Sequence, residues 1–180
     1  MKFIETPLEG VFELDAAPHI DNRGAFARLY CQEVSEQAGI RFSVRQINLS
    51  MNPCKHTLRG MHYQDPPYAE AKFVRAARGR AYDVALDLRR DSPTFRKWHA
   101  VELSGEQMNG LYLPEGIAHG FLTLEPNTDI LYLMDRIFEP GHGRGVRYDD
   151  PSFAIDWPER PNVISDRDRS YPDWCNELMT

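Results

Sequence analysis

Hydrophobic and polar residues alternate along short stretches of this chain, and turn signals such as DNRG, DPP, PEG and EPN separate the stretches. A two-residue period is typical of strands with one buried face, and strands this short and numerous favour an antiparallel sandwich or barrel. A helical period is confined to CQEVSEQAGI (31–40), which Gly39 closes. The expected strands are VFEL (11–14), AFARLY (25–30), VRQINLS (44–50), KFVRAAR (72–78), AYDVALDLR (81–89), WHAVELS (98–104), NGLYLP (109–114), HGFLTLE (119–125) and DILYLMDRIF (129–138).

The alternation also places polar side chains on one face of several strands. In residues 44–50, Gln46, Asn48 and Ser50 share one face, and Arg45, Ile47 and Leu49 share the other. Tyr132 and Phe138 fall on one face of the last expected strand. A barrel with a partly polar interior is a cleft that can hold a ligand. A bulge at Gly60 would reverse the alternation within LRGMHYQ (58–64).

Composition narrows the class of protein. The chain has 180 residues with 42% hydrophobic and 27% charged residues, which predicts one globular domain over 1–180. The formal net charge of −6 argues against nucleic-acid binding but not against a small anion held by local arginines. No apolar run is long enough for a membrane span, and the first residues do not resemble a secretory signal. Three widely spaced cysteines indicate free thiols in a reducing cytoplasm.

Two motifs carry candidate chemistry. LRGMHYQ places a guanidinium, an imidazole, a phenol and an amide within one short segment. PEGIAHGF (114–121) contains a PxGxxH turn, which recurs in cupin jelly rolls where the histidine can bind a metal. The usual first cupin metal motif offers HxH and a glutamate. Here only His62, Glu70 and His119 could contribute, one imidazole short of that set, so we expect no metal.

Taken with AKFVRAARGRAYDVALDLRRDSPTFRKW (71–98) and YDDPSFAIDWP (148–158), these motifs resemble the nucleotide-sugar 3,5-epimerase family. The resemblance runs from DNRGAF (21–26) to SDRD (165–168). It implies an all-β cupin-type jelly roll with a few short helices, a homodimer, and no metal or organic cofactor. It also implies a role in cytoplasmic deoxysugar or polysaccharide synthesis.

The resemblance implies the reaction as well. The substrate would be a 4-keto-6-deoxyhexose on a nucleoside diphosphate, in which the C4 carbonyl acidifies the hydrogens at C3 and C5. Such an enzyme needs a base, a group that stabilises the enolate, and an acid on the opposite face. His62 matches the family's base and Asp168 the carboxylate paired with it. Lys72 matches the lysine near the keto oxygen, and Tyr132 matches the acid.

The same resemblance implies contacts to the substrate. Arg59 and Arg23 match contacts to the sugar nucleotide, and guanidinium groups suit phosphate oxygens. Phe138 matches an aromatic ring stacked on the nucleobase. The remaining matches are Phe26, Arg28, Gln46, Asn48 and His119.

Three positions depart from the family's common pattern. The family commonly has glutamate where this chain has Arg28, aspartate where it has Ile47, and often glutamate near Gly143. The sequence therefore leaves open whether the nucleotide is dTDP, CDP or GDP, and whether C3, C5 or both are inverted.

Each of these residues also has a purely structural interpretation. Tyr132 could fill the barrel, Lys72 could be solvated, and Asp168 could lie in a charged surface turn. His19, His56, His99 and His142 are interpreted as surface or loop residues without a function. Three other functions compete for the whole protein: a sugar-nucleotide 3,4-ketoisomerase, a metal-dependent cupin oxygenase, and a non-catalytic sugar-binding cupin.

Overall fold

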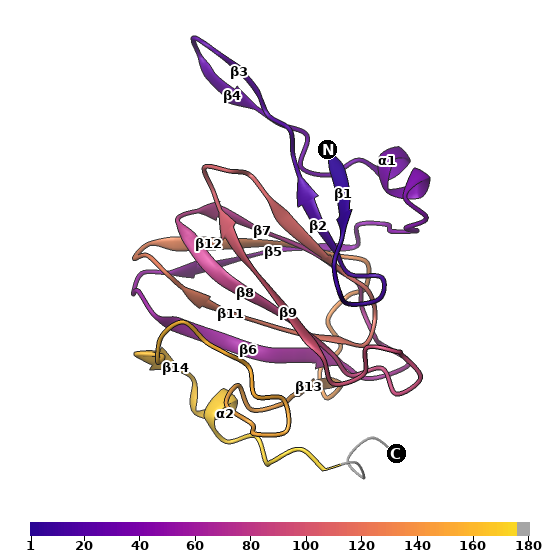
Figure 1. Ribbon diagram of the computed structural model, residues 1–180, viewed down its shortest axis with the longest axis vertical. Coiled ribbons are helices and arrows are strands. Elements are labelled where there is room, and N and C mark those ends of the chain that lie inside the picture. The colour runs from indigo at the N-terminus through magenta and orange to yellow at the C-terminus, as the bar shows by residue number, and fades with distance from the viewer. Residues whose placement is uncertain (176–180) are drawn as a thin grey trace.

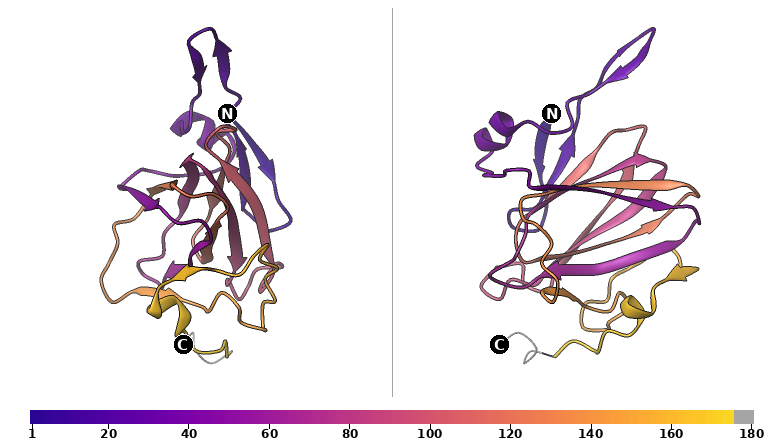
Figure 2. Two further views of the ribbon diagram at one scale, coloured as in Figure 1. Left: turned by 90° about the vertical axis from the view of Figure 1, so that its left-hand side faces the viewer. Right: turned by 180° about the vertical axis from the view of Figure 1, so that it is seen from behind.

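The computed structural model describes residues 1–175, in which two antiparallel β-sheets face each other as a sandwich (Figures 1 and 2). Sheet A has the strand order β1 (Lys2–Glu5), β2 (Phe12–Asp15), β10 (Gly110–Leu113), β7 (Lys72–Arg78), β12 (Thr128–Met134) and β5 (Gln46–Asn52). Sheet B has the order β13 (Gly143–Gly145), β6 (Thr57–Gln64), β11 (Ile117–Thr123), β8 (Arg80–Asp87) and β9 (Trp98–Ser104), and β14 (Val163–Ile164) pairs with β6 in parallel. The predicted all-β sandwich is confirmed.

Two short helices and a separate hairpin complete the described chain. Helix α1 (Gln32–Gln37) lies within the predicted helix 31–40, and α2 (Asp166–Arg169) follows β14. The hairpin of β3 (His19–Asp21) and β4 (Gly24–Phe26) projects away from the sandwich (Figure 1). No helix among residues 1–175 is long and apolar enough to cross a membrane.

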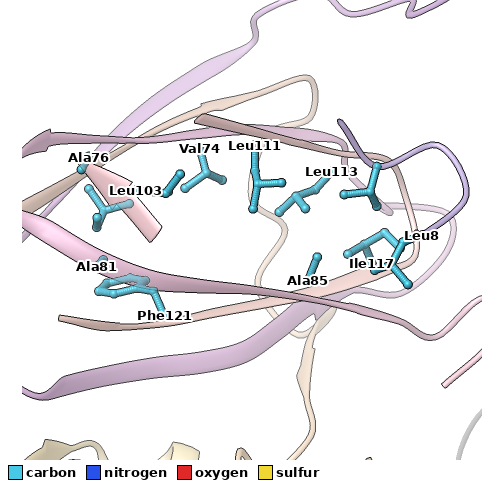
Figure 3. Packing of buried hydrophobic residues seen from close by; sticks show 12 residues of the cluster. Leu8, Val74, Ala76, Ala81, Ala85, Leu103, Leu111, Leu113, Ile117 and Phe121 are labelled. Carbon is cyan, nitrogen blue, oxygen red and sulfur yellow. The ribbon is translucent and has the colours of Figure 1, made fainter. Parts of the chain in front are cut away.

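The main core fills the space between the sheets. Val74, Leu111 and Leu113 of sheet A face Ala81, Ala85, Ile117 and Phe121 of sheet B (Figure 3). The inward residues recur at every second position, as the alternation of strands requires. The pattern of residues 71–134 therefore determines which side chains enter the space between the sheets.

Irregular segments cover the outer faces of both sheets. The stretch around α1 packs Tyr30, Ile40 and Phe42 on Phe73 of sheet A. The C-terminal segment packs aromatic residues, including Trp157 and Trp174, on the outer face of sheet B. Because these two segments bury the outer faces of the sheets, many strands carry apolar residues on both of their faces. The C-terminal cover also carries α2 beneath β6 (Figure 1).

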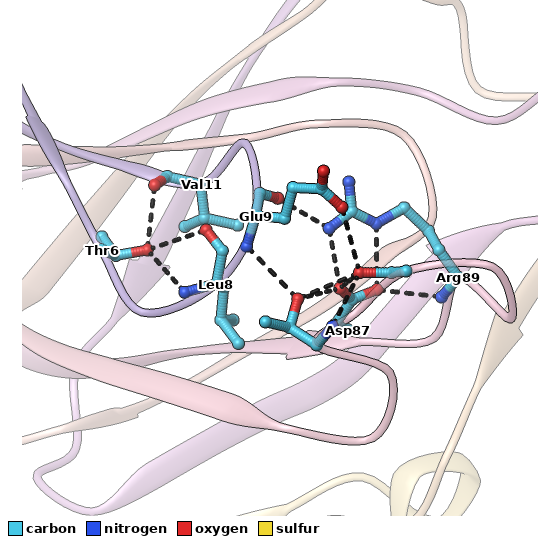
Figure 4. A network of polar contacts seen from close by, with 8 residues as sticks. Thr6, Leu8, Glu9, Val11, Asp87 and Arg89 are labelled. Atoms are coloured by element: carbon cyan, nitrogen blue, oxygen red, sulfur yellow. Dashed lines mark hydrogen bonds and ion pairs between the residues drawn. The ribbon is translucent and has the colours of Figure 1, made fainter.

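A polar network ties the N-terminal segment to the end of β8 (Figure 4). The buried Asp87 carboxylate accepts hydrogen bonds from Arg89, Ser92 and Thr94. Arg89 also donates to the carbonyl of Glu9, and the Glu9 amide donates to Thr94. Burial raises the pKa of Asp87, but these hydrogen bonds outweigh burial and lower it.

Two sequence expectations were wrong in detail. AFARLY is not one strand, because β4 ends at Phe26 and the following residues are irregular. Strand β12 ends at Met134, so Phe138 lies in a loop and does not share a strand face with Tyr132.

The bulge considered at Gly60 is present. His62 pairs with His119, and Arg59 pairs with Phe121. Strand β6 therefore has one more residue than β11 between these two pairs, which defines a β-bulge. Gly60 has a φ of +141°, and a Cβ there would lie 2.5 Å from the Cα of Gly120. Glycine is therefore required at this close approach of two strands. The extra residue interrupts the alternation of β6, so Arg59 and His62, three positions apart, need not lie on opposite faces of the strand.

Candidate active site

His62 and Asp168 form the centre of the candidate site. The His62 Nε2 atom lies 2.7 Å from Asp168 Oδ1, although 106 residues separate them in the chain. The Asp168 side chain is only 5% exposed, whereas that of His62 is 40% exposed. An ionised carboxylate only accepts hydrogen bonds, so Nε2 carries the proton and Nδ1 keeps the lone pair that a base needs.

Helix α2 fixes the position of Asp168. Ser165 caps the helix by accepting a hydrogen bond from the Asp168 amide at 3.1 Å. The second carboxylate oxygen, Oδ2, accepts from the Gly60 amide at 3.3 Å. Burial raises the pKa of Asp168, but its hydrogen bonds with His62, Gly60 and Ser165 lower it below the ordinary value. Asp168 is thus held as an anion behind the imidazole.

A second histidine–aspartate pair lies beside the first. His119 is the direct cross-strand neighbour of His62. Its Nε2 lies 2.9 Å from both carboxylate oxygens of Asp83, and both residues are buried. The Tyr132 ring on β12 meets the His119 ring edge-on, with ring centroids 5.8 Å apart. Burial and the Asp83 carboxylate raise the pKa of Tyr132, and Arg59 opposes them, so the phenol keeps its proton.

Lys72 enters the site from the start of β7. Its Nζ lies 2.8 Å from Glu70 Oε1 and donates to the His62 carbonyl at 3.3 Å. Lys72 and Glu70 are each 6% exposed. The alternative that Lys72 is an ordinary solvated lysine is therefore wrong.

Three of the residues predicted to bind substrate, Arg59, Gln46 and Asn48, make hydrogen bonds to neighbouring side chains or amides. Arg59 is exposed, and its Nε donates to Asn52 at 2.8 Å. The side chains of Gln46 and Asn48 hydrogen-bond to each other, and Gln46 also accepts from the Phe138 amide. A cavity of about 410 Å³ opens beside His62. Its lining residues are Thr57, Leu58, Arg59, His62, Val163, Ile164, Ser165, Arg167 and Asp168.

Gly143 lies beside the Phe138 ring and the Arg167 guanidinium. A Cβ there would lie 3.3 Å from the Phe138 ring and 3.4 Å from the guanidinium of Arg167. The Phe138 ring, Gly143 and Arg167 therefore form one wall near the His62 cavity, where a larger residue 143 would contact both neighbours.

The structure does not bring the hairpin residues to this site. Arg23 is exposed and pairs with Asp21 at 2.6 Å, and Phe26 is 79% exposed. Arg28 is exposed just after the hairpin. The hairpin extends beyond the sandwich (Figure 2). Within one chain, these three residues are apart from His62.

A second cavity, of about 1,080 Å³, contains none of the predicted catalytic residues. It lies between the segment around α1 and the loop after β12, with Arg45, Tyr68 and Arg136 in its wall. Among residues 1–175, no three His, Cys, Asp or Glu side chains gather as a set of metal ligands. His62, Glu70 and His119 each have a different partner.

Sequence reasoning missed Asp83, Arg167 and the pairing of Glu70. Asp83 occupies an inward position on β8 between the core residues Ala81 and Ala85. A carboxylate at a core-facing position needs a buried partner, and this signal was readable. Arg167 adjoins Asp168 in a segment that resembles a charged surface turn, so sequence alone offered little signal.

Comparison with known proteins agrees with this geometry. The family model of dTDP-4-dehydrorhamnose 3,5-epimerase matches residues 5–176. A dTDP-4-dehydrorhamnose 3,5-epimerase from Shigella flexneri is 38% identical over 169 residues, which cover 93% of each chain.

Solved structures extend the agreement to three dimensions. The dTDP-4-dehydrorhamnose 3,5-epimerase from Bacillus anthracis, solved with TDP and PPi bound, superposes with a TM-score of 0.93. It is 38% identical, and the match covers 96% of this chain and 99% of that one. A 3'-monoepimerase from Streptomyces bikiniensis in complex with dTDP-quinovose has a TM-score of 0.87, 32% identity, and coverage of 93% and 85%. The chain therefore belongs to the dTDP-4-dehydrorhamnose 3,5-epimerase family, whose members epimerise nucleotide-linked 4-keto-6-deoxy sugars.

Proposed function

We propose that this protein inverts both C3 and C5 of dTDP-4-keto-6-deoxyglucose, and that residues 1–180 form one epimerase domain. The family match and the functions of the Shigella and Bacillus relatives support the double epimerisation. The monoepimerase relative shows that inversion at one carbon is possible on a closely similar fold. We also propose a cytoplasmic location, which the three free cysteines support.

One observation carries the mechanism: the base and the acid belong to opposite sheets. His62 lies on β6 of sheet B, and Tyr132 lies on β12 of sheet A. A sugar ring between the sheets would meet the imidazole on one face and the phenol on the other. Inversion needs this arrangement, because the proton must return to the face opposite the one it left.

Each remaining group has a role in the proposed reaction. Nδ1 of His62 takes the proton from C3 or C5, and Asp168 stabilises the imidazolium that forms. The ammonium of Lys72 stabilises the enolate that the C4 carbonyl becomes. Tyr132 then protonates the enolate carbon, and the phenolate recovers a proton afterwards. His119, fixed by Asp83, orients the substrate beside Tyr132.

Fewer residues are candidates for binding the nucleoside diphosphate part of the substrate. The Phe138 ring offers a face on which the nucleobase can stack, while Arg59 and Arg167 offer guanidinium groups for the diphosphate. Relatives with bound TDP or dTDP-quinovose support dTDP. Arg28, Ile47 and Gly143 keep CDP and GDP sugars as the alternatives to test.

A homodimer is part of this proposal. The hairpin carrying Arg23 and Phe26 projects away from its own sandwich, so if these residues bind substrate, the substrate would be that of another copy. Ile47, Leu49 and Met51 on the edge strand β5 are 62%, 53% and 67% exposed, and they offer an apolar contact surface. Together these features support two sites, each completed by the partner's hairpin.

Proton NMR in deuterated water tests the reaction. The protein is incubated separately with dTDP-, CDP- and GDP-linked 4-keto-6-deoxyglucose. We expect loss of both the C3 and C5 proton signals with the dTDP sugar. Loss of one signal would make the protein a monoepimerase, and no loss in any tube would favour the ketoisomerase or the sugar-binding cupin.

Subunit mixing tests the shared site. Arg23→Ala/Phe26→Ala protein is mixed with His62→Ala protein under conditions that exchange subunits. Random dimers would regain about a quarter of wild-type activity, because half the dimers are mixed and each has one intact site. A mixture as inactive as its components would contradict the exchange of hairpins.

A further inference from the structure

We propose that Glu70 is a positioning residue that keeps Lys72 protonated and aimed at the substrate, which deepens the proposed function and rests on the role of Lys72 in it. Glu70 lies just before β7, two residues from Lys72. Its Oε1 is 2.8 Å from the Lys72 ammonium. The same ammonium also donates a hydrogen bond to the His62 carbonyl at 3.3 Å.

Among residues 1–175, Lys72 is the only hydrogen-bond or ion-pair partner of the Glu70 carboxylate. Both side chains are almost fully buried, at 4% exposure for Glu70 and 8% for Lys72. The second oxygen of Glu70, Oε2, is buried and has no hydrogen-bond partner among residues 1–175. An ionised carboxylate in such a place depends on its one cation, and that cation depends equally on the carboxylate.

This mutual dependence matters for the enolate. A lysine stabilises an enolate through its charge, and an ammonium in a poorly solvated site loses its proton readily when no anion is near. The His62 carbonyl is neutral, so among residues 1–175 Glu70 supplies the only full negative charge in contact with the Lys72 ammonium. Removing that charge would leave the ammonium without an anionic partner and so weaken its hold on its proton.

The surrounding groups do not titrate in the alkaline range. His62 faces the pair from β6 with Asp168 behind it, and Asp135 after β12 accepts a hydrogen bond from the Ala71 amide. Above pH 7.5 ordinary carboxylates are ionised and ordinary imidazoles are neutral. Burial raises the pKa of Tyr132, of Tyr63 and of Tyr171, so these phenols keep their protons. The other nearby charges are Arg59, Arg136 and Glu115, which do not change in this range.

The chain offers a direct measurement of this protonation state that does not require activity. It has four lysines, Lys2, Lys55, Lys72 and Lys97, so ¹³Cε-labelled lysine gives four signals. The Lys72 signal is assigned by its loss in Lys72→Arg. We expect the titration midpoint of Lys72 to fall by at least one pH unit in Glu70→Gln, a tenfold change in its proton affinity. An unchanged midpoint in folded Glu70→Gln would overturn the proposal.

The rate profile supplies the functional readout. The ratio of kcat/KM at pH 9.5 to that at pH 7 should fall at least tenfold in Glu70→Gln relative to wild type. Glu70→Asp, which restores a carboxylate, should return most of this ratio. Glu106→Gln, which removes an exposed carboxylate in a turn, serves as the matched control and should leave the profile unchanged.

The possible failures are distinguishable. If wild type exchanges no substrate protons, the proposed function fails while the lysine titration still tests Glu70. If Glu70→Gln loses activity by the same factor at every pH and its Lys72 midpoint is unchanged, Glu70 is merely structural and the proposal is wrong. If Glu70→Gln does not fold, Glu70→Ala decides by the same titration: a midpoint at least one pH unit below wild type supports the proposal, and an unchanged midpoint overturns it.

Discussion

The two histidine–aspartate pairs have the same chemical groups but different surroundings. His62 is 40% exposed at the side chain and makes one contact with an aspartate from a distant helix. His119 is 5% exposed, and both oxygens of Asp83 on the neighbouring strand contact its Nε2. A base must reach its substrate and exchange protons, whereas an orienting group must stay fixed. Exposure and the origin of the carboxylate therefore separate the two roles more clearly than residue type does.

The largest predicted effect is that of His62→Ala. Removing the proposed base should lower epimerisation and solvent deuterium uptake by about 10³-fold or more, because His62 is the only histidine among residues 1–175 that lines the cavity. Proton NMR in deuterated water measures both quantities. Circular dichroism should show an unchanged fold, and an active variant would contradict the assignment of the base.

Asp168→Asn should have the next largest effect. The amide can donate a hydrogen bond to Nε2 and thereby favour the wrong tautomer of His62, so kcat should fall on the order of 10²-fold. Asp166→Asn, which changes an exposed carboxylate in the same helix, is the matched control. Equal activities of the two variants would remove Asp168 from the mechanism.

Asp83→Asn should lower the stability of the protein more than its activity, the reverse of Asp168→Asn. If His119 orients substrate and does not take its proton, as proposed, kcat/KM should fall by about tenfold or less. The free energy of unfolding should fall by about 3 kcal/mol, since one member of a buried pair is replaced. Urea denaturation measures that change. A larger kinetic loss than in Asp168→Asn, with little change in stability, would exchange the roles of the two pairs.

The smallest predicted effect concerns acid stability. Because the folded state lowers the pKa of Asp168, this residue stabilises the protein above the unfolded-state value of about 4. That contribution disappears as the pH falls through the folded-state value. The stability difference between wild type and Asp168→Asn should therefore be present at pH 7 and shrink below about pH 4. A difference that grows on acidification would show that the pKa is raised instead.

Local patterns predicted most of the sandwich. Strands β7 and β9 begin and end where their alternation does. The errors arose where another force overrode the pattern. Phe138 leaves the strand because the loop after Met134 bonds its amide to Gln46. AFARLY alternates like a core strand, yet only Ala25 and Phe26 lie in a strand, the exposed β4 of the hairpin, whereas Tyr30 at its other end packs on Phe73.

The site was predictable in part. The pairing of His62 with Asp168 joins segments 106 residues apart, and only the family resemblance indicated it. Asp83 could have been recognised as a carboxylate at a core position, whereas the role of Glu70 needed the distance to Lys72. Tertiary distances of this kind depend on how the sheets pack, which the period of a strand does not encode.

The most direct test of the two-sided mechanism is Tyr132→Phe in deuterated water, with deuterium uptake and inversion measured in the same sample. If His62 and Tyr132 act from opposite sheets, His62 should still remove the proton and return deuterium to the same face. We therefore predict deuterium uptake with retained configuration, and inversion reduced by about 10²-fold relative to uptake. Parallel loss of uptake and inversion would contradict the central claim that the base and the acid approach the sugar from opposite sheets.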